Sequence, residues 1–227
     1  MSASFAGKSA FVTGGGSGMG REVALLLSER GASVAVCDIN SVTAASTVEA
    51  MGVSRGASYS ATLDVTDSGA VNAAVAAAES KLGRIDLVVN IAGIYQSKPT
   101  EEITDADWAR MFAIHANGMF YVCRAALPGM VARRSGSIVN MSSIHAVRGQ
   151  ANAVHYSAAK GAIMGLTKGI AREKGQFGIR VNAVAPGPVD TPLWRGSNTG
   201  EKLESIKTER AKIIPSDASR SPPRWQR

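Results

Sequence analysis

A tyrosine and a lysine with helical spacing are the residues of this sequence best suited to proton transfer. Tyr156 and Lys160 lie four positions apart in a segment of helical pattern, so their side chains share one face. A free tyrosine phenol has a pKa of about 10, and a nearby ammonium group favours its phenolate. We therefore predict that Tyr156 acts as a general acid or base and that Lys160 lowers its pKa.

A serine pair ends an apolar run thirteen residues before Tyr156. Ser142 and Ser143 follow the run 137–141, whose composition predicts a buried strand. Ligands of open α/β sheets bind at the carboxyl ends of the strands. We expect Ser143 to hydrogen-bond a substrate oxygen near Tyr156, and we interpret Ser142 as a structural neighbour.

A glycine-rich segment, 13–20, predicts a dinucleotide site. It reads Thr-Gly-Gly-Gly-Ser-Gly-Met-Gly and separates an apolar run from an amphipathic one, as in a strand–turn–helix unit. Without a Cβ, glycine lets a pyrophosphate approach the backbone, and the amides at the helix start face the anion. Asp38 ends the next strand, where it can bind both ribose hydroxyls and repel a 2′-phosphate. Because neither Ser17 nor Ile39 is basic, we predict NAD rather than NADP.

Strand-like and helical segments alternate along the chain. This alternation predicts an α/β fold of the Rossmann type, a doubly wound parallel sheet with helices on both faces. Thr104 and Asp107 are expected to form a capping box. The predicted strands are 8–13, 32–38, 57–63, 85–90, 136–142 and 179–185, and the predicted helices are 19–30, 41–51, 67–82, 104–133 and 154–177.

Composition fits a globular protein, with 45% hydrophobic residues in a chain of 227. We predict a dinucleotide-binding and catalytic domain over residues 1–192, and a substrate lid with an irregular tail over 193–227. No signal-like segment or membrane-length apolar run is present, so we expect a cytoplasmic protein with no membrane partner. Cys37 and Cys123 lie in apolar segments and are expected to be buried free thiols.

The net charge of +7 does not by itself indicate a nucleic-acid partner. Much of the excess of basic over acidic residues lies in 193–227. No basic cluster alternates with aromatic residues, so we expect no nucleic acid to bind. His115, His145 and His155 lack metal-ligand spacing with cysteines or carboxylates, so no metal site is expected.

Taken together, these motifs resemble the short-chain dehydrogenase/reductase family over about residues 5 to 192. The family's N-N-A-G motif is present with Ile91 in place of its second asparagine. The Tyr-x3-Lys pair and the P-G motif complete the match. The matching positions, in chain order, are Thr13, Gly14, Gly18, Gly20, Asp64, Asn90, Ala92, Gly93, Asn117, Ser143, Tyr156, Lys160, Pro186 and Gly187.

The resemblance implies roles for these residues. Asn117, Ser143, Tyr156 and Lys160 would be catalytic, with Asn117 holding a water that links Lys160 to solvent. The alternative for Asn117 is an ordinary polar residue of a helix. The residues implied to bind the cofactor are Gly14, Ser17, Gly18, Met19, Gly20, Asp38, Ile39, Asp64, Val65, Asn90, Ala92, Gly93, Tyr156, Lys160, Pro186, Gly187, Val189 and Thr191. The candidates for the substrate pocket, with packing as the alternative, are Tyr95, Gln96, His145, Val147, Gln150 and Trp194.

The resemblance implies an oxidoreductase that interconverts a small alcohol and a ketone with NAD(H). One alternative is a 3-oxoacyl-thioester reductase, because the segment 149–152 resembles that of such enzymes. An alternative of another class is a cofactor-binding sensor or scaffold without turnover.

The C-terminal region departs from the family pattern. Relatives continue to a seventh strand, whereas 215–227 shows no strand alternation and contains three prolines, which points to a truncated or frame-shifted end or to a natural variant. The sixth strand would then become an apolar edge. We expect a homodimer through the long helices 104–133 and 154–177, instead of the family's usual homotetramer.

Overall fold

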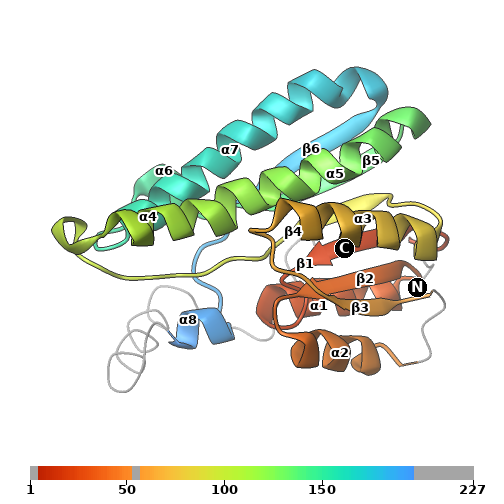
Figure 1. Ribbon diagram of the computed structural model, residues 1–227, viewed down its shortest axis with the longest axis horizontal. Helices are drawn as coiled ribbons and strands as arrows, with labels where there is room; N and C mark the ends of the chain where they lie inside the picture. Colours follow the sequence, from red (N-terminus) through yellow and green to blue (C-terminus); the bar gives the residue numbers. More distant parts are fainter. Residues whose placement is uncertain (1–4, 53–56, 197–227) are drawn as a thin grey trace, which may run out of the picture.

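Six parallel strands form the centre of the computed structural model, which describes residues 5–52 and 57–196 (Figure 1). Their order is β3-β2-β1-β4-β5-β6, so the chain begins in the middle of the sheet and winds outward in both directions. The predicted fold class is confirmed. The strands are β1 (Ser9–Thr13), β2 (Ser33–Asp38), β3 (Tyr59–Thr62), β4 (Leu87–Asn90), β5 (Gly136–Met141) and β6 (Ile179–Val184).

Helices cover both faces of this sheet because its central strands are apolar on both sides. All five residues of β1 are buried, and successive side chains point to opposite faces. Val12 packs with the cluster under α1 (Gly18–Glu29) and α2 (Ser41–Ala50). Phe11 packs with the cluster under α3 (Ser68–Leu82), α5 (Gly118–Arg133) and α7 (Val154–Lys174).

The single helix predicted over 104–133 is wrong in detail. The structure divides it into α4 (Asp105–Phe112), a π-helical turn (Ala113–Asn117) and α5. Thr104 and Asp107 form the predicted capping box at the start of α4. A π turn inserts one residue into an α-helix and is commonly found at functional sites. A turn of five residues is too short for hydrophobic periodicity in the sequence to reveal.

Two short helices of the described residues were not predicted, η1 (Thr100–Glu102) and α6 (His145–Arg148). The short helix α8 (Pro192–Gly196) lies at the start of 193–214, where short helices were an open possibility, and η3 (Gly175–Phe177) ends the predicted helix 154–177. Each is too short for a periodic pattern to reveal. Both cysteines are buried and free, as expected.

The strand order places a topological switch between β1 and β4, where ligands of this architecture bind. The outer strands of the sheet among the described residues are β3 and β6, and Val184 at the end of β6 is 47% exposed. The expectation of a missing seventh strand concerns 215–227, which lies outside the described residues.

Candidate active site

Strand β5 and helix α7 are joined by two hydrogen bonds that position Lys160. The Ser142 hydroxyl donates to the Lys160 carbonyl at 2.9 Å, and the Lys160 ammonium donates to the Met141 carbonyl at 2.7 Å. Lys160 is only 4% exposed, and its Nζ lies 5.7 Å from the centroid of the Tyr156 ring. The strand end and the helix therefore hold Ser143, Tyr156 and Lys160 in one cluster.

The two serines occupy different environments. Ser142 faces the backbone of α7, which fits its interpretation as a structural residue. The Ser143 hydroxyl accepts a hydrogen bond from the His145 amide at 3.2 Å and is a hydrogen-bond partner of Tyr156. Ser143 is therefore the serine beside the phenol.

Burial dominates the electrostatics of the cluster. It raises the pKa of Tyr156, while the Ser143 hydrogen bond acts in the opposite direction. Burial also lowers the pKa of Lys160 to about 7, because the charged ammonium loses its hydration. The expected lowering of the Tyr156 pKa, by Lys160 together with the positive nicotinamide of an oxidised cofactor, is not seen in the chain by itself and stays a prediction for the cofactor complex.

Three rings surround Tyr156 edge-on. Tyr95 lies at a centroid distance of 5.1 Å with the planes at 73°, and His115 at 5.5 Å and 85°. His145 lies at 6.4 Å and 64°. Such edge-to-face contacts restrict a ring and exclude water from it. His145 and Tyr95, both pocket candidates, are thus placed beside the phenol.

The structure does not bring Asn117 to this cluster. Its side chain is exposed, and the hydrogen bonds of the described residues include none from it. His115, two residues earlier in the π turn, is buried instead, and its Nε2 lies 2.8 Å from the Ile94 carbonyl. Sequence spacing missed His115 because no periodic pattern reveals the π turn that contains it. The implied role of Asn117, holding a water that links Lys160 to solvent, stays a prediction.

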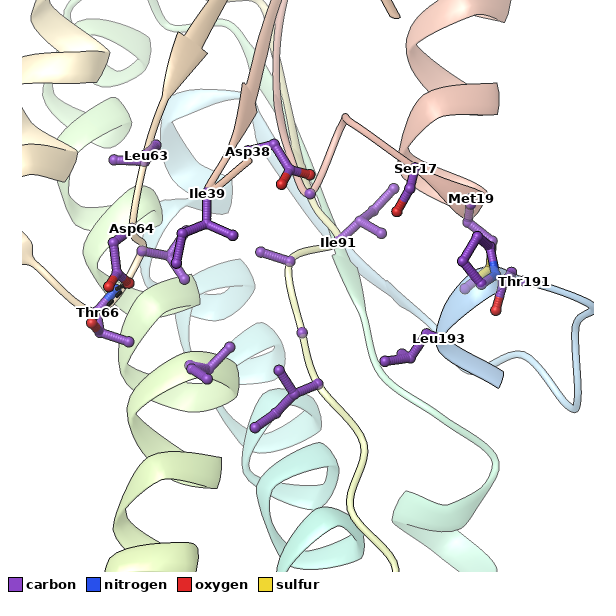
Figure 2. A pocket seen from close by; sticks show the side chains of 18 of the residues that line it. Ser17, Met19, Asp38, Ile39, Leu63, Asp64, Thr66, Ile91, Thr191 and Leu193 are labelled. Carbon is purple, nitrogen blue, oxygen red and sulfur yellow. Dashed lines mark hydrogen bonds between the residues drawn. The ribbon is translucent and has the colours of Figure 1, made fainter. Parts of the chain in front are cut away.

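A cavity of about 490 Å³ opens at the carboxyl ends of β1, β2 and β3 (Figure 2). Figure 2 shows Asp38 at the end of β2, Ile39 just after it and Asp64 after β3, with Met19, Thr191 and Leu193 across the opening. The predicted cofactor residues that line it are Gly14, Ser17, Gly18, Met19, Asp38, Ile39, Asp64, Val65, Ala92, Gly93 and Thr191. The lining residues not predicted are Leu63, Thr66, Ile91, Ile94, Arg110, Ile114, Pro192 and Leu193. Most of these residues lie within two positions of a predicted residue in the sequence, and this proximity could have identified them.

The glycine turn is built as a close-packed cradle. A Cβ on Gly20 would meet the Gly14 carbonyl, and a Cβ on Gly14 would lie 2.8 Å from the Ala92 amide nitrogen. Gly14 also has a positive φ of 66°. The carboxylate of Asp38 accepts hydrogen bonds from the amides of Gly16 at 2.9 Å and Asn40 at 3.0 Å. These features fit the pyrophosphate and ribose of a dinucleotide.

The remaining predicted cofactor residues lie outside the cavity lining. Asn90 is buried, and its amide donates to the Asn140 Oδ1 at 2.9 Å. The Pro186 carbonyl accepts from the Ile144 amide at 3.1 Å, which attaches the segment after β6 to the segment after β5. Gly187 has open space around its Cα, and Val189 is 39% exposed.

Residues 5–52 and 57–196 contain neither a cluster of metal-ligating side chains nor a helix that could cross a membrane. No group of three or more histidine, cysteine or carboxylate side chains there could hold a metal ion. Likewise, within residues 5–52 and 57–196, no helix is long and apolar enough to cross a membrane.

Comparison with known proteins identifies the family. The profile described as short chain dehydrogenase matches residues 8–202. The chain belongs to this family. A short-chain dehydrogenase/reductase named ABA4 of Pyricularia oryzae is 42% identical over 195 residues, which cover 84% of this chain and 72% of that protein. The resemblance on which the site residues were assigned is thus confirmed at the level of the family.

Other members of the short-chain dehydrogenase family are similar over most of the chain. The 3-oxoacyl-[acyl-carrier-protein] reductase FabG of Chlamydia muridarum is 36% identical, covering 88% of this chain and 81% of that protein. The D-threitol dehydrogenase of Mycolicibacterium smegmatis is 36% identical, covering 92% and 79%. A crystal structure assigned to a short-chain dehydrogenase/reductase of Burkholderia xenovorans has a TM-score of 0.87 at 31% identity, covering 94% of this chain and 84% of that one. Members of this family are oxidoreductases that use nicotinamide cofactors.

Proposed function

We propose that this protein interconverts an alcohol and a carbonyl compound with NAD(H), using Tyr156 as the general acid or base. The observation that carries the proposal is the convergence of Ser143, Tyr156 and Lys160 where β5 meets α7. The Ile91–Ile94 segment lines the dinucleotide-sized cavity, and its Gly93 packs against the His115 ring that contacts Tyr156. Cofactor and acid–base group are therefore neighbours.

The proposed mechanism assigns one task to each side chain. In the direction of reduction, Ser143 donates a hydrogen bond to the carbonyl oxygen and holds it near the Tyr156 hydroxyl. NADH, when bound, would supply a hydride for the carbonyl carbon. Tyr156 gives its proton to the oxygen, and the positive charge of Lys160 stabilises the phenolate that remains. Oxidation of the alcohol is the reverse.

NAD is the proposed cofactor because a carboxylate stands at the ribose position. Asp38 lines the cavity and is held by two backbone amides, so it cannot easily move away from a 2′-phosphate. A phosphate placed there would meet a like charge, whereas the two ribose hydroxyls would find acceptors.

The test is steady-state turnover by the purified chain. NADH and NADPH are offered with acetoacetyl-CoA and simple ketones, and NAD and NADP with D-threitol and simple alcohols. The proposal predicts turnover of at least one of these compounds, with NAD(H) preferred. Cofactor binding without turnover of any compound would instead support the sensor or scaffold.

A 3-oxoacyl-thioester reductase is the second candidate. It is favoured by the names of two relatives, the reductase FabG above and an acetoacetyl-CoA reductase of Synechocystis that is 37% identical to this chain. A kcat/KM for acetoacetyl-CoA well above that for D-threitol and the simple ketones would select it.

We also propose a homodimer in the cytoplasm, with small molecules as its substrates. The helices α5 and α7 run side by side (Figure 1) and form a groove of about 400 Å³. Its lining includes Phe120, Leu127, Val131 and Ile170, and Phe120 is 38% exposed. A second copy of the same helices would cover this apolar strip. A homotetramer remains the alternative assembly.

A further inference from the structure

A chain of hydrogen bonds joins the start of α4 to the start of α7 beside Tyr156. The Gln96 side-chain amide donates to the Asp107 Oδ1 at 2.9 Å. The Gln96 Oε1 lies 3.0 Å from the Nε2 of His155. Gln96 belongs to the segment between β4 and η1, so this chain connects three parts of the fold that are distant in sequence.

The direction of these bonds follows from the Asp107 carboxylate. Its pKa is held well below the usual range, first by the Lys98 ammonium at 2.8 Å and then by Gln96 and the Thr104 amide. An ionised carboxylate only accepts, so Gln96 must present its NH2 group to it. The Gln96 Oε1 is then left for His155, whose Nε2 must carry the donated hydrogen. His155 is fully buried, so this bond is shielded from water.

The two ends of the Gln96–His155 bond adjoin the two tyrosines of the site. Gln96 follows Tyr95 in the sequence, and His155 precedes Tyr156. The Tyr95 and Tyr156 rings meet at a centroid distance of 5.1 Å. A backbone bond from the Lys98 amide to the Asn152 carbonyl, at 2.6 Å, fixes the same two segments a few residues away. The Gln96–His155 hydrogen bond therefore joins the residues adjacent in sequence to the two contacting rings, Tyr95 and Tyr156.

We propose that Gln96 is a positioning residue that, through its bond to His155, holds Tyr95 against Tyr156 and so shapes the substrate side of the active site. This role rests on the proposed function of Tyr156. Gln96 touches neither substrate nor cofactor in this assignment. Its loss would let the segment 94–98 move away from α7 and widen the space in which the substrate oxygen is held.

Four variants test the proposal. Gln96→Leu and His155→Leu remove the bond, whereas His155→Gln keeps an N–H donor at a similar reach. Lys98→Met removes the ammonium that pairs with Asp107 and leaves the Gln96–His155 bond intact, so it is the matched control. Each variant is compared with the wild type by melting temperature, by amide hydrogen exchange over 94–98, and by steady-state kinetics with NADH and acetoacetyl-CoA, or with NAD and D-threitol if only that pair turns over.

The two leucine variants should exchange faster over 94–98 and show a substrate KM about three- to tenfold higher, the range expected for one hydrogen bond. Their Kd for NADH, measured by fluorescence, should stay within about twofold of the wild type, since the cofactor cavity is untouched. Lys98→Met should match the wild type in substrate KM and in hydrogen exchange over 94–98. His155→Gln should have the substrate KM of the wild type.

Other outcomes overturn the proposal. It fails if Lys98→Met raises KM as much as His155→Leu, if His155→Gln does not rescue, or if only the melting temperature changes. Wild-type protein without turnover would contradict the proposed function instead. In that case the exchange data, with an ultraviolet titration of the tyrosine phenols, decide whether the bond holds the two rings together.

Discussion

The His115 ring stands edge-on to the Tyr156 ring, with centroids 5.5 Å apart and planes at 85°. Its other neighbour is Gly93, where an added Cβ would collide with the imidazole. Its Nε2 lies 2.8 Å from the Ile94 carbonyl, which fixes the ring's orientation. One imidazole therefore separates the wall of the cofactor cavity from the proposed acid–base residue.

Replacing His115 should change how stability depends on pH. Burial, helped by the nearby Lys160 charge, lowers the pKa of His115 to about 3, whereas an unfolded histidine titrates near 6.5. Between these values the unfolded chain binds more protons, so stability falls as the pH falls, by up to about 1 kcal/mol per pH unit from this group. The free energy of unfolding of His115→Asn, measured by urea denaturation from pH 7 to 4, should decline less steeply. Parallel curves for the two proteins would contradict the assignment.

Tyr156→Phe should remove turnover and leave cofactor binding nearly intact. The phenylalanine keeps the ring contacts and loses only the proton-transferring hydroxyl, so kcat should fall by at least about 10²- to 10⁴-fold. Lys160→Ala should lower both the rate and the affinity for NADH, because the family resemblance implies that Lys160 binds the cofactor as well as stabilising the phenolate. Stopped assays and fluorescence titration measure the two effects separately. A fully active Tyr156→Phe variant would refute the mechanism.

Asp38 should determine the preference for NAD over NADP. In Asp38→Asn, the carboxylate charge is lost, while the side-chain oxygen can still accept from the Gly16 amide. We expect the ratio of kcat/KM values to shift toward NADP by about tenfold, which corresponds to one charge-assisted hydrogen bond. A wild-type kcat/KM with NADP equal to that with NAD would sink this prediction.

Gly20→Ala should destabilise the protein and weaken cofactor binding. The new methyl group would strike the Gly14 carbonyl, so the turn must open. Gly165→Ala, in a position of α7 with open space around it, is the matched control and should raise stability by up to about 1 kcal/mol through helix propensity. Thermal unfolding with and without NADH tests both. Equal behaviour of the two variants would exclude a special packing role for Gly20.

Phe120→Glu should dissociate the proposed dimer. A charge placed in the apolar groove between α5 and α7 would lose its hydration if a second copy covered it. Multi-angle light scattering should find a dimer for the wild type and a monomer for the variant. A wild-type monomer, a stable tetramer, or a variant that stays dimeric would each contradict the proposed interface.

The sequence predicted the sheet because its strands are short, apolar and regularly spaced by helices. The glycine turn was equally readable, since the contact between Gly14 and Gly20 leaves no room for another residue type. Asp38 and Ser143 were found because each ends a strand at the ligand-binding edge. These features are local, and local spacing is what a sequence displays.

Features that depend on tertiary contacts were not predictable in this way. His115 lies edge-on to Tyr156 from within the π turn at Ala113–Asn117, and no periodic pattern reveals that turn. The rise in the Tyr156 pKa depends on how many atoms bury it, which spacing does not report. The Gln96–His155 bond joins residues 59 positions apart and has no sequence signature.

The paired hydrogen bonds between β5 and α7 have an evolutionary consequence. The Ser142 hydroxyl binds the backbone of Lys160, and the Lys160 ammonium binds the backbone of Met141, so neither bond involves residues 94–99 or 190–196. Residues 94–99 and 190–196 can accordingly vary in length and chemistry while the proton donor keeps its place. A chimaera that received these two segments from a relative would inherit a new substrate range on an unchanged reaction.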